Sequence, residues 1–301
     1  MTGNFGDRLT EANRRLGSVL CMGIDPHCNM IPSLFGNANA EAGSPQAINA
    51  ISNFITACLD SAIGKVVAIK PQAAFFEQQG PDGMQLLQTL GQAAINSNLL
   101  VIMDAKRGDI GSTSTAYANA WIGHDATFPS DALTVNPWLG IDTLDPFLAR
   151  ADATFSGLFV LNRTSNDGAG DLQSQMVDGA PMYTHLASML APLAAMRVGE
   201  KGVSSLGIVA GATWPDDAKT LRAALPHAPF LVPGFGVQGA GAEMATIGLL
   251  RGASGWEGGI VNSTRGLIFP KTAANATSLA DWHVAIESTI AENTAILNAA
   301  F

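Results

Sequence analysis

Short apolar runs recur along the chain. They are rich in Val, Ile and Leu, and most of them end in Gly, Pro or a polar cluster. Runs this short, with no polar alternation, are typical of strands buried on both faces of a parallel sheet. The eight runs lie at residues 18–26, 65–72, 99–106, 132–137, 157–166, 205–213, 229–236 and 259–266.

Stretches with helical periodicity separate these runs. Ser44 precedes Pro45, the apolar residues that follow fall on one helical face, and Gly64 comes after the last of them. This pattern predicts a helix with Ser44 as its N-cap, Pro45 in its first turn and Gly64 at its end.

Other segments between the runs are interpreted in the same way. Residues 82–96 and 114–122 have helical patterns, and Ser278 with Asp281 has the spacing of a capping box before a last helix. Two longer segments, 29–43 and 166–202, carry no such pattern, and we expect them to be loop insertions.

Strands that alternate with helices indicate a parallel sheet, and eight is the number of strands that closes a (β/α)8 barrel. A doubly wound open sheet is the alternative. It is disfavoured because no Gly-x-Gly-x-x-Gly follows the first run, where Asp25 and Pro26 stand instead. We therefore expect an α/β protein with a single TIM-barrel domain over residues 1–301.

Composition and charge exclude several classes of partner. The formal net charge is −9 and the Lys and Arg residues are scattered, so no basic stripe is available for nucleic acid or an anionic membrane. The first residues lack the apolar core of a signal peptide, and no apolar run approaches the roughly 18 residues that span a bilayer. The cysteines and histidines lack metal-ligand spacing. We expect a cytoplasmic protein without a His-based metal centre.

The chemistry is expected where the apolar runs stop, because functional side chains of such barrels lie at the carboxyl ends of the strands. The run from Leu99 ends in Asp104 and Lys106, which are two residues apart and therefore share a face. Asp109 follows beyond the strand. The residues at corresponding strand ends are Asp25, Lys70, Asp104, Lys106, Asn136, Thr164, Ser165, Gln238 and Arg265.

The last two strand ends favour a phosphate. The segment PGFGVQGAG begins with Pro233 and Gly234, and its backbone N–H groups can approach an anion closely. Gln238 adds an amide donor in this segment, and Arg265 offers a bidentate fork for phosphate oxygens. Because barrels often bind phosphate at these strands, we expect a phosphorylated substrate.

The motif DAKRGDIGST is preceded by a lysine in AIKPQAAFFE and followed by PGFGVQG and by an arginine in NSTRG. Together these motifs closely resemble the orotidine 5'-phosphate decarboxylase family, in particular its longer bacterial branch (type 2). The likeness runs from Gly23 to Thr264 and beyond. It implies a carboxy-lyase that converts orotidine 5'-monophosphate to UMP and CO2, the last step of UMP biosynthesis, without a cofactor or a metal.

The resemblance also implies roles for individual residues. Lys70, Asp104, Lys106 and Asp109 match the family's alternating charged tetrad, in which Lys106 corresponds to the proton donor to C6 of the pyrimidine. In that family the last aspartate reaches the neighbouring subunit's site, so a homodimer is implied in which Asp109 and Thr113 cross the interface. The remaining matches are Asp25 and Lys70 for the ribose hydroxyls, Thr164 or Ser165 for the pyrimidine, and Gln238 with Arg265 for the phosphate.

Two other functions compete with this interpretation. A sugar-phosphate decarboxylase or aldolase of the same superfamily would use Asp104 and Asp109 around Mg²⁺. Lys70 argues against it, because those relatives have an acidic metal ligand near that position. A non-catalytic barrel that binds a nucleotide is the other alternative, and the intact charged tetrad argues against that one.

Overall fold

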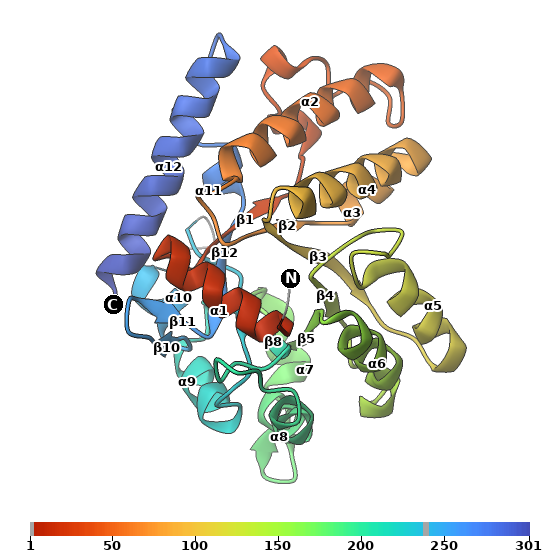
Figure 1. Cartoon of the computed structure of the whole chain (residues 1–301), viewed down its shortest axis with the longest axis vertical. Helices are drawn as coiled ribbons and strands as arrows, with labels where there is room; N and C mark the ends of the chain where they lie inside the picture. The colour runs from red at the N-terminus through yellow and green to blue at the C-terminus, as the bar shows by residue number, and fades with distance from the viewer. Residues whose placement is uncertain (1–2, 237–240) are drawn as a thin grey trace.

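Eight parallel strands close into a barrel, and helices surround them (Figure 1). The computed structural model describes residues 3–236 and 241–301. The barrel strands are β1 (Leu20–Ile24), β2 (Ala68–Pro71), β3 (Leu100–Arg107), β4 (Ala132–Val135), β5 (Gly157–Arg163), β8 (Leu206–Ala210), β9 (Phe230–Val232) and β12 (Gly259–Ser263). Each predicted run contains one of these strands, apart from β3, which ends one residue beyond its run, and the predicted (β/α)8 barrel is confirmed.

One helix precedes β1, and the others lie between or after the strands. The longer ones are α1 (Phe5–Leu16), α2 (Pro45–Ala62), α4 (Gly80–Asn96), α5 (Gly111–Trp121), α6 (Asp145–Thr154), α8 (Met182–Ala195), α9 (Pro215–Ala224) and α12 (Leu279–Ala299). Short helices are α3 (Ala74–Glu77), α7 (Gly170–Gln173), α10 (Ala242–Thr246) and α11 (Arg265–Ile268). Two small hairpins complete the fold: β6 (Met176–Val177) with β7 (Ala180–Pro181), and β10 (Leu250–Arg251) with β11 (Trp256–Glu257). Every helix in the described residues falls short of the length and apolar content needed to cross a membrane.

The predicted helix ends are confirmed where a side chain makes the cap. The hydroxyl of Ser44 accepts a hydrogen bond from the amide of Ala47, and Pro45 is the first residue of α2. The hydroxyl of Ser278 accepts from the amide of Asp281 at the start of α12. These caps satisfy amides that lack a partner within the helix.

The predicted insertion at 166–202 is wrong in part. Residues 182–195 form α8, the crossover helix between β5 and β8, and its Ala187 and Leu190 are fully buried. Apolar residues also occupy its outer face, as Met189 does, and Pro192 lies inside the helix, so the sequence pattern shows no polar stripe. The segment 29–43 has only short 3-10 turns and agrees with the expected insertion.

Helix α1 closes the amino-terminal end of the barrel and was not predicted. Figure 1 shows it lying across the middle of the ring of helices. Phe5 and Leu9 are fully buried in the barrel interior, and the Phe5 ring packs edge-on against Phe159, with 5.7 Å between centroids. Arg8 pairs with Asp131 at the start of β4. The open end of the barrel is therefore the carboxyl end of the strands.

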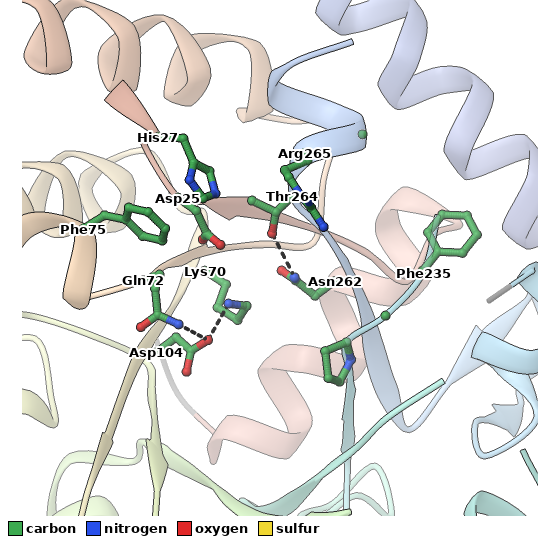
Figure 2. Close-up of a pocket in the computed structure, with 13 residues that line it drawn as sticks. Asp25, His27, Lys70, Gln72, Phe75, Asp104, Phe235, Asn262, Thr264 and Arg265 are labelled. Atoms are coloured by element: carbon green, nitrogen blue, oxygen red, sulfur yellow. Dashed lines mark hydrogen bonds and ion pairs between the residues drawn. The ribbon is translucent and has the colours of Figure 1, made fainter. Parts of the chain in front are cut away.

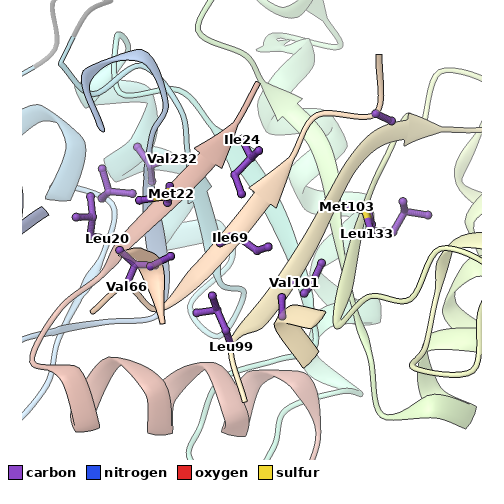
Figure 3. Packing of buried hydrophobic residues seen from close by; sticks show 14 of the residues in the cluster. Leu20, Met22, Ile24, Val66, Ile69, Leu99, Val101, Met103, Leu133 and Val232 are labelled. Atoms are coloured by element: carbon purple, nitrogen blue, oxygen red, sulfur yellow. The ribbon is translucent and has the colours of Figure 1, made fainter. Parts of the chain in front are cut away.

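Side chains alternate along the strands between the barrel interior and the helical layer. Met22, Ile69 and Val101 belong to the cluster between strands and helices (Figure 3), whereas Ala68 and Ile102 point inward. This alternation is the period-2 geometry of a strand. The residues two positions after Ala68 and Ile102 lie on the same inward face, closer to the carboxyl ends of the strands. Their side chains therefore point into the mouth of the barrel.

Candidate active site at the carboxyl ends of the strands

A cavity of about 360 Å³ opens at the mouth of the barrel (Figure 2). Lys70 follows Ala68 on the inward face of β2, and Asp104 follows Ile102 on that of β3. Asp25 follows the end of β1, and Arg265 opens α11 directly after β12. These predicted site residues line one cavity together with Pro233 and Gly234.

A row of three charged groups lies at the mouth of the barrel: Lys70 and Asp104 line the cavity, and Lys106 stands beside them, outside the described lining. Nζ of Lys70 lies 2.6 Å from Oδ2 of Asp104, and Nζ of Lys106 lies 2.5 Å from Oδ1 of the same carboxylate. Gln72 donates a further hydrogen bond to Oδ2, at 3.2 Å. Lys70 and Asp104 are buried, while the Lys106 side chain is 43% exposed. The outer ammonium group is therefore the one that can meet a reactant.

The pKa values of the buried pair move apart. Burial raises the pKa of Asp104, but Lys70 and Lys106 outweigh it and hold that pKa well below its usual range. Burial lowers the pKa of Lys70, but the charges of Asp104 and Asp25 outweigh it and hold that pKa above its usual range. Both groups are therefore ionised at neutral pH, and the opposite charges make their burial tolerable.

Two side chains of the cavity wall each carry a buried oxygen without a protein donor. Oδ1 of Asp25 and Oδ1 of Asn262 are both inaccessible to water and have no hydrogen-bond partner among the described residues. Burial raises the pKa of Asp25, and the charge of Lys70 opposes this. Because unpaired buried acceptors are costly, a ligand whose hydroxyl groups reach Asp25 and Asn262 would be stabilised there.

The other end of the cavity suits an anion. Arg265 is exposed there, and Gly234, with a φ of +101°, brings backbone to the cavity wall. This φ favours glycine because a Cβ would be strained in that conformation. Gln238, which the sequence placed in the same loop, lies outside the described residues.

Several predicted residues lie away from this cavity. Oδ1 of Asp109 accepts the amide of Ile110, and Thr113 is exposed in the first turn of α5, so neither belongs to the cavity wall within the described chain. Asn136 is also exposed, and its Oδ1 accepts the amide of Trp138 in its own turn. The structure does not bring these three residues to this cavity.

Thr164 and Ser165 differ in how their hydroxyl groups are used. The Thr164 hydroxyl donates to Asn166 at 2.7 Å and accepts from Gln173 at 2.9 Å, so its hydrogen-bonding capacity is taken up locally. Ser165 makes no side-chain hydrogen bond within the described residues. Of the two, Ser165 retains the hydroxyl that a ligand can use.

The structure brings to the site several residues that the sequence pattern did not predict. Asn262 and Thr264 line the cavity, as do Gln72, His27 and Phe75. Thr134 donates a hydrogen bond to Asp104. Strand alternation was the available signal, because Thr134 lies two positions after the inward-facing Ala132, and Asn262 two after Ile260.

The fold and the site define a barrel enzyme whose charged centre combines two lysines with a buried carboxylate, beside an arginine and a glycine-containing loop suited to an anion. The chain belongs to the orotidine 5'-phosphate decarboxylase / HUMPS family, whose model matches residues 18–270.

Individual relatives agree with this assignment. The chain is 40% identical to the orotidine 5'-phosphate decarboxylase of Rhodopirellula baltica over 291 residues, which covers 94% of this chain and 95% of that protein. It is 41% identical to that of Streptomyces coelicolor over 237 residues, covering 78% and 80% of the two chains. The structure of Leishmania donovani OMP decarboxylase superposes with a TM-score of 0.73 at 30% identity, covering 99% of this chain and 98% of that one.

Proposed function

We propose that this chain decarboxylates orotidine 5'-monophosphate to UMP and CO2 in pyrimidine biosynthesis, with Lys106 as the proton donor. The observation that carries the proposal is the row Lys70–Asp104–Lys106 at the mouth of the barrel. Family membership and the names of the relatives support the same reaction.

The proton donor follows from the chemistry of the reaction. The bond between C6 and the carboxylate breaks, CO2 leaves, and the electron pair stays on C6. This carbon has no conventional electron sink, so the protein stabilises the negative charge. Nζ of Lys106 is held by Asp104 with its side chain partly exposed, and it donates its proton to C6 to give UMP. Solvent then returns a proton to the amine.

The remaining contacts with the substrate divide among the predicted site residues, of which Gln238 lies outside the described part of the chain. Arg265 and the backbone at Pro233 and Gly234 hold the phosphate, and Gln238 of the same loop adds a donor. Asp25 and Lys70 contact the ribose, and the unpaired Oδ1 of Asp25 supports this role. Ser165 contacts the pyrimidine, since the hydroxyl of Thr164 is taken up by its neighbours. The phosphate contacts lie far from the reacting carbon and supply binding energy that orders the site.

The magnesium-dependent alternative fits these residues poorly. It requires Asp104 as a metal ligand, but both of its carboxylate oxygens lie against ammonium groups, those of Lys70 and Lys106. A divalent cation placed there would meet two positive charges at close range. The arrangement therefore favours decarboxylation that uses protein charges alone.

The direct test is the loss of orotidine 5'-monophosphate absorbance, measured with and without EDTA. We expect turnover at the same rate in both conditions, with UMP as the product, because no step of the proposal uses a metal. The proposal is overturned if this substrate is not consumed and activity appears instead on a sugar phosphate only after Mg²⁺ is added.

A shared site in a homodimer accounts for Asp109 and Thr113. Asp109 lies beside Ile110, which is 62% exposed, and the next loop carries Trp138, which is 67% exposed. The two loops touch, since a Cβ on Gly108 would come within 2.5 Å of the Asn136 carbonyl oxygen. An exposed apolar patch of this kind supports an interface with a second copy of the chain.

The shared site predicts complementation between inactive variants. In a hybrid of Asp109→Ala and Lys106→Ala subunits, one site combines the intact Lys106 of one chain with the intact Asp109 of the other. Random exchange makes half of the dimers hybrids, so about a quarter of the wild-type activity should return.

A matched pair of variants controls this experiment. Asp104→Ala mixed with Lys106→Ala should restore nothing, because the two residues form an ion pair within one chain and serve the same site. No recovery in the first mixture, with subunit exchange verified by mass, would contradict the shared site and leave the decarboxylase assignment untouched.

A further inference from the structure

The pairing of β3 with β4 is irregular at the charged centre. Met103 pairs with Leu133, and Arg107 pairs with Val135. The two paired positions are four residues apart on β3 but only two apart on β4, so β3 bulges between them. Inside this bulge Lys106 adopts a φ of +48°, in the left-handed region that residues with a side chain rarely occupy. A conformation of this kind persists only where its surroundings hold it in place.

One buried hydroxyl group makes two contacts inside this bulge. Oγ1 of Thr134 accepts a hydrogen bond from the backbone amide of Lys106, at 3.0 Å. It donates to Oδ1 of Asp104, also at 3.0 Å. That carboxylate oxygen is the one that binds Nζ of Lys106. Thr134 is 1% exposed, so no water competes for either contact.

We infer that Thr134 is a positioning residue for proton transfer: its hydroxyl fixes the backbone of Lys106 and the carboxylate that aims its ammonium group. The inference rests on the proposed role of Lys106 as the proton donor. Without the hydroxyl the Lys106 amide loses its partner and Oδ1 of Asp104 loses one donor, so both ends of the Lys106 side chain become less constrained. Thr134 itself is absent from the cavity wall within the described residues.

Because Thr134 acts through Lys106, its loss should affect the chemical step more than substrate binding. Thr134→Val keeps the shape of the side chain and removes the hydroxyl, whereas Thr134→Ser keeps the hydroxyl. A hydrogen bond to a charged group corresponds to about a 10- to 100-fold effect. We expect Thr134→Val to lower kcat by about that factor, with KM and the affinity for UMP within about twofold of wild type, and Thr134→Ser to recover most of kcat.

A second measurement isolates the proton transfer. By microscopic reversibility, the enzyme should exchange the C6 hydrogen of UMP for solvent deuterium through Lys106. This exchange should fall in Thr134→Val by the same factor as kcat. Thr10→Val is the matched control, because Thr10 is also fully buried and also makes a hydroxyl hydrogen bond, to the Gly6 carbonyl in α1. Thermal unfolding of both variants separates lost stability from lost positioning.

The outcomes separate this inference from the proposed function. If wild-type protein does not consume orotidine 5'-monophosphate, the proposed function fails. If it does, and Thr134→Val retains the wild-type kcat, the positioning role is overturned. A Thr134→Ser variant as impaired as Thr134→Val also overturns it, because the hydroxyl is then not the group that matters.

Discussion

Replacing Lys106 with alanine is expected to lower kcat by about 10⁴-fold or more, while UMP still binds. The variant removes both the proton donor to C6 and the fixed positive charge beside the developing carbanion. Each loss lowers the rate of the chemical step substantially. Binding persists because the phosphate and ribose contacts remain in place. Single-turnover assays give the rate, and calorimetric titration with UMP gives the affinity.

The control for this variant is Lys65→Ala. Lys65 is another partly exposed lysine in an ion pair, 3.2 Å from Glu287, and it lies outside the cavity. We expect its removal to leave kcat unchanged. A Lys106→Ala variant that keeps its rate within tenfold of wild type would contradict the role of Lys106 as the proton donor.

Arg265→Ala should have the second large effect, a loss of about 10²- to 10⁴-fold in kcat/KM. A guanidinium group can form two charge-assisted hydrogen bonds with one phosphate, and each contributes about 1.5–3 kcal/mol. Steady-state kinetics with orotidine 5'-monophosphate measure the loss. Arg265→Lys should recover only part of it, because an ammonium group cannot reproduce the bidentate geometry.

A substrate analogue without the phosphate supplies the sharper control for Arg265. Orotidine lacks the phosphate, so the weak turnover of this nucleoside should be the same in wild type and in Arg265→Ala. An equal loss on both substrates would mean that Arg265 supports the fold of the site rather than the phosphate, and the assignment would be wrong.

The predicted contact between Asp104 and Lys106 is confirmed, but its cause differs from the one that the sequence suggested. Simple alternation places two side chains on one face of a regular strand. In the protein β3 bulges at this point, Lys106 adopts a positive φ, and a hydroxyl from β4 holds the bulge. The neighbouring strand supplies that hydroxyl, and strand pairing is invisible in a single run of residues.

In the helical layer, too, local sequence signals predicted some features and tertiary contacts decided others. Ser44 and Ser278 identify the starts of α2 and α12 because a cap acts within a few residues of chain. α8 has no capping side chain and carries apolar residues on its outer face, so neither local signal is present. The role of α1 depends on Phe5 reaching Phe159, and that contact exists only after the barrel has closed.

The sequence by itself determined the eight buried strands, the barrel class and the charged residues at the strand ends, because periodicity and strand polarity are local properties of the chain. The tertiary structure decided which of these residues share one cavity, and it added Asn262 and Thr134 to them. It also turned Thr164 and Asn136 toward their own loops. These outcomes depend on register and hydrogen bonding between segments far apart in the chain, which only closure of the barrel brings together.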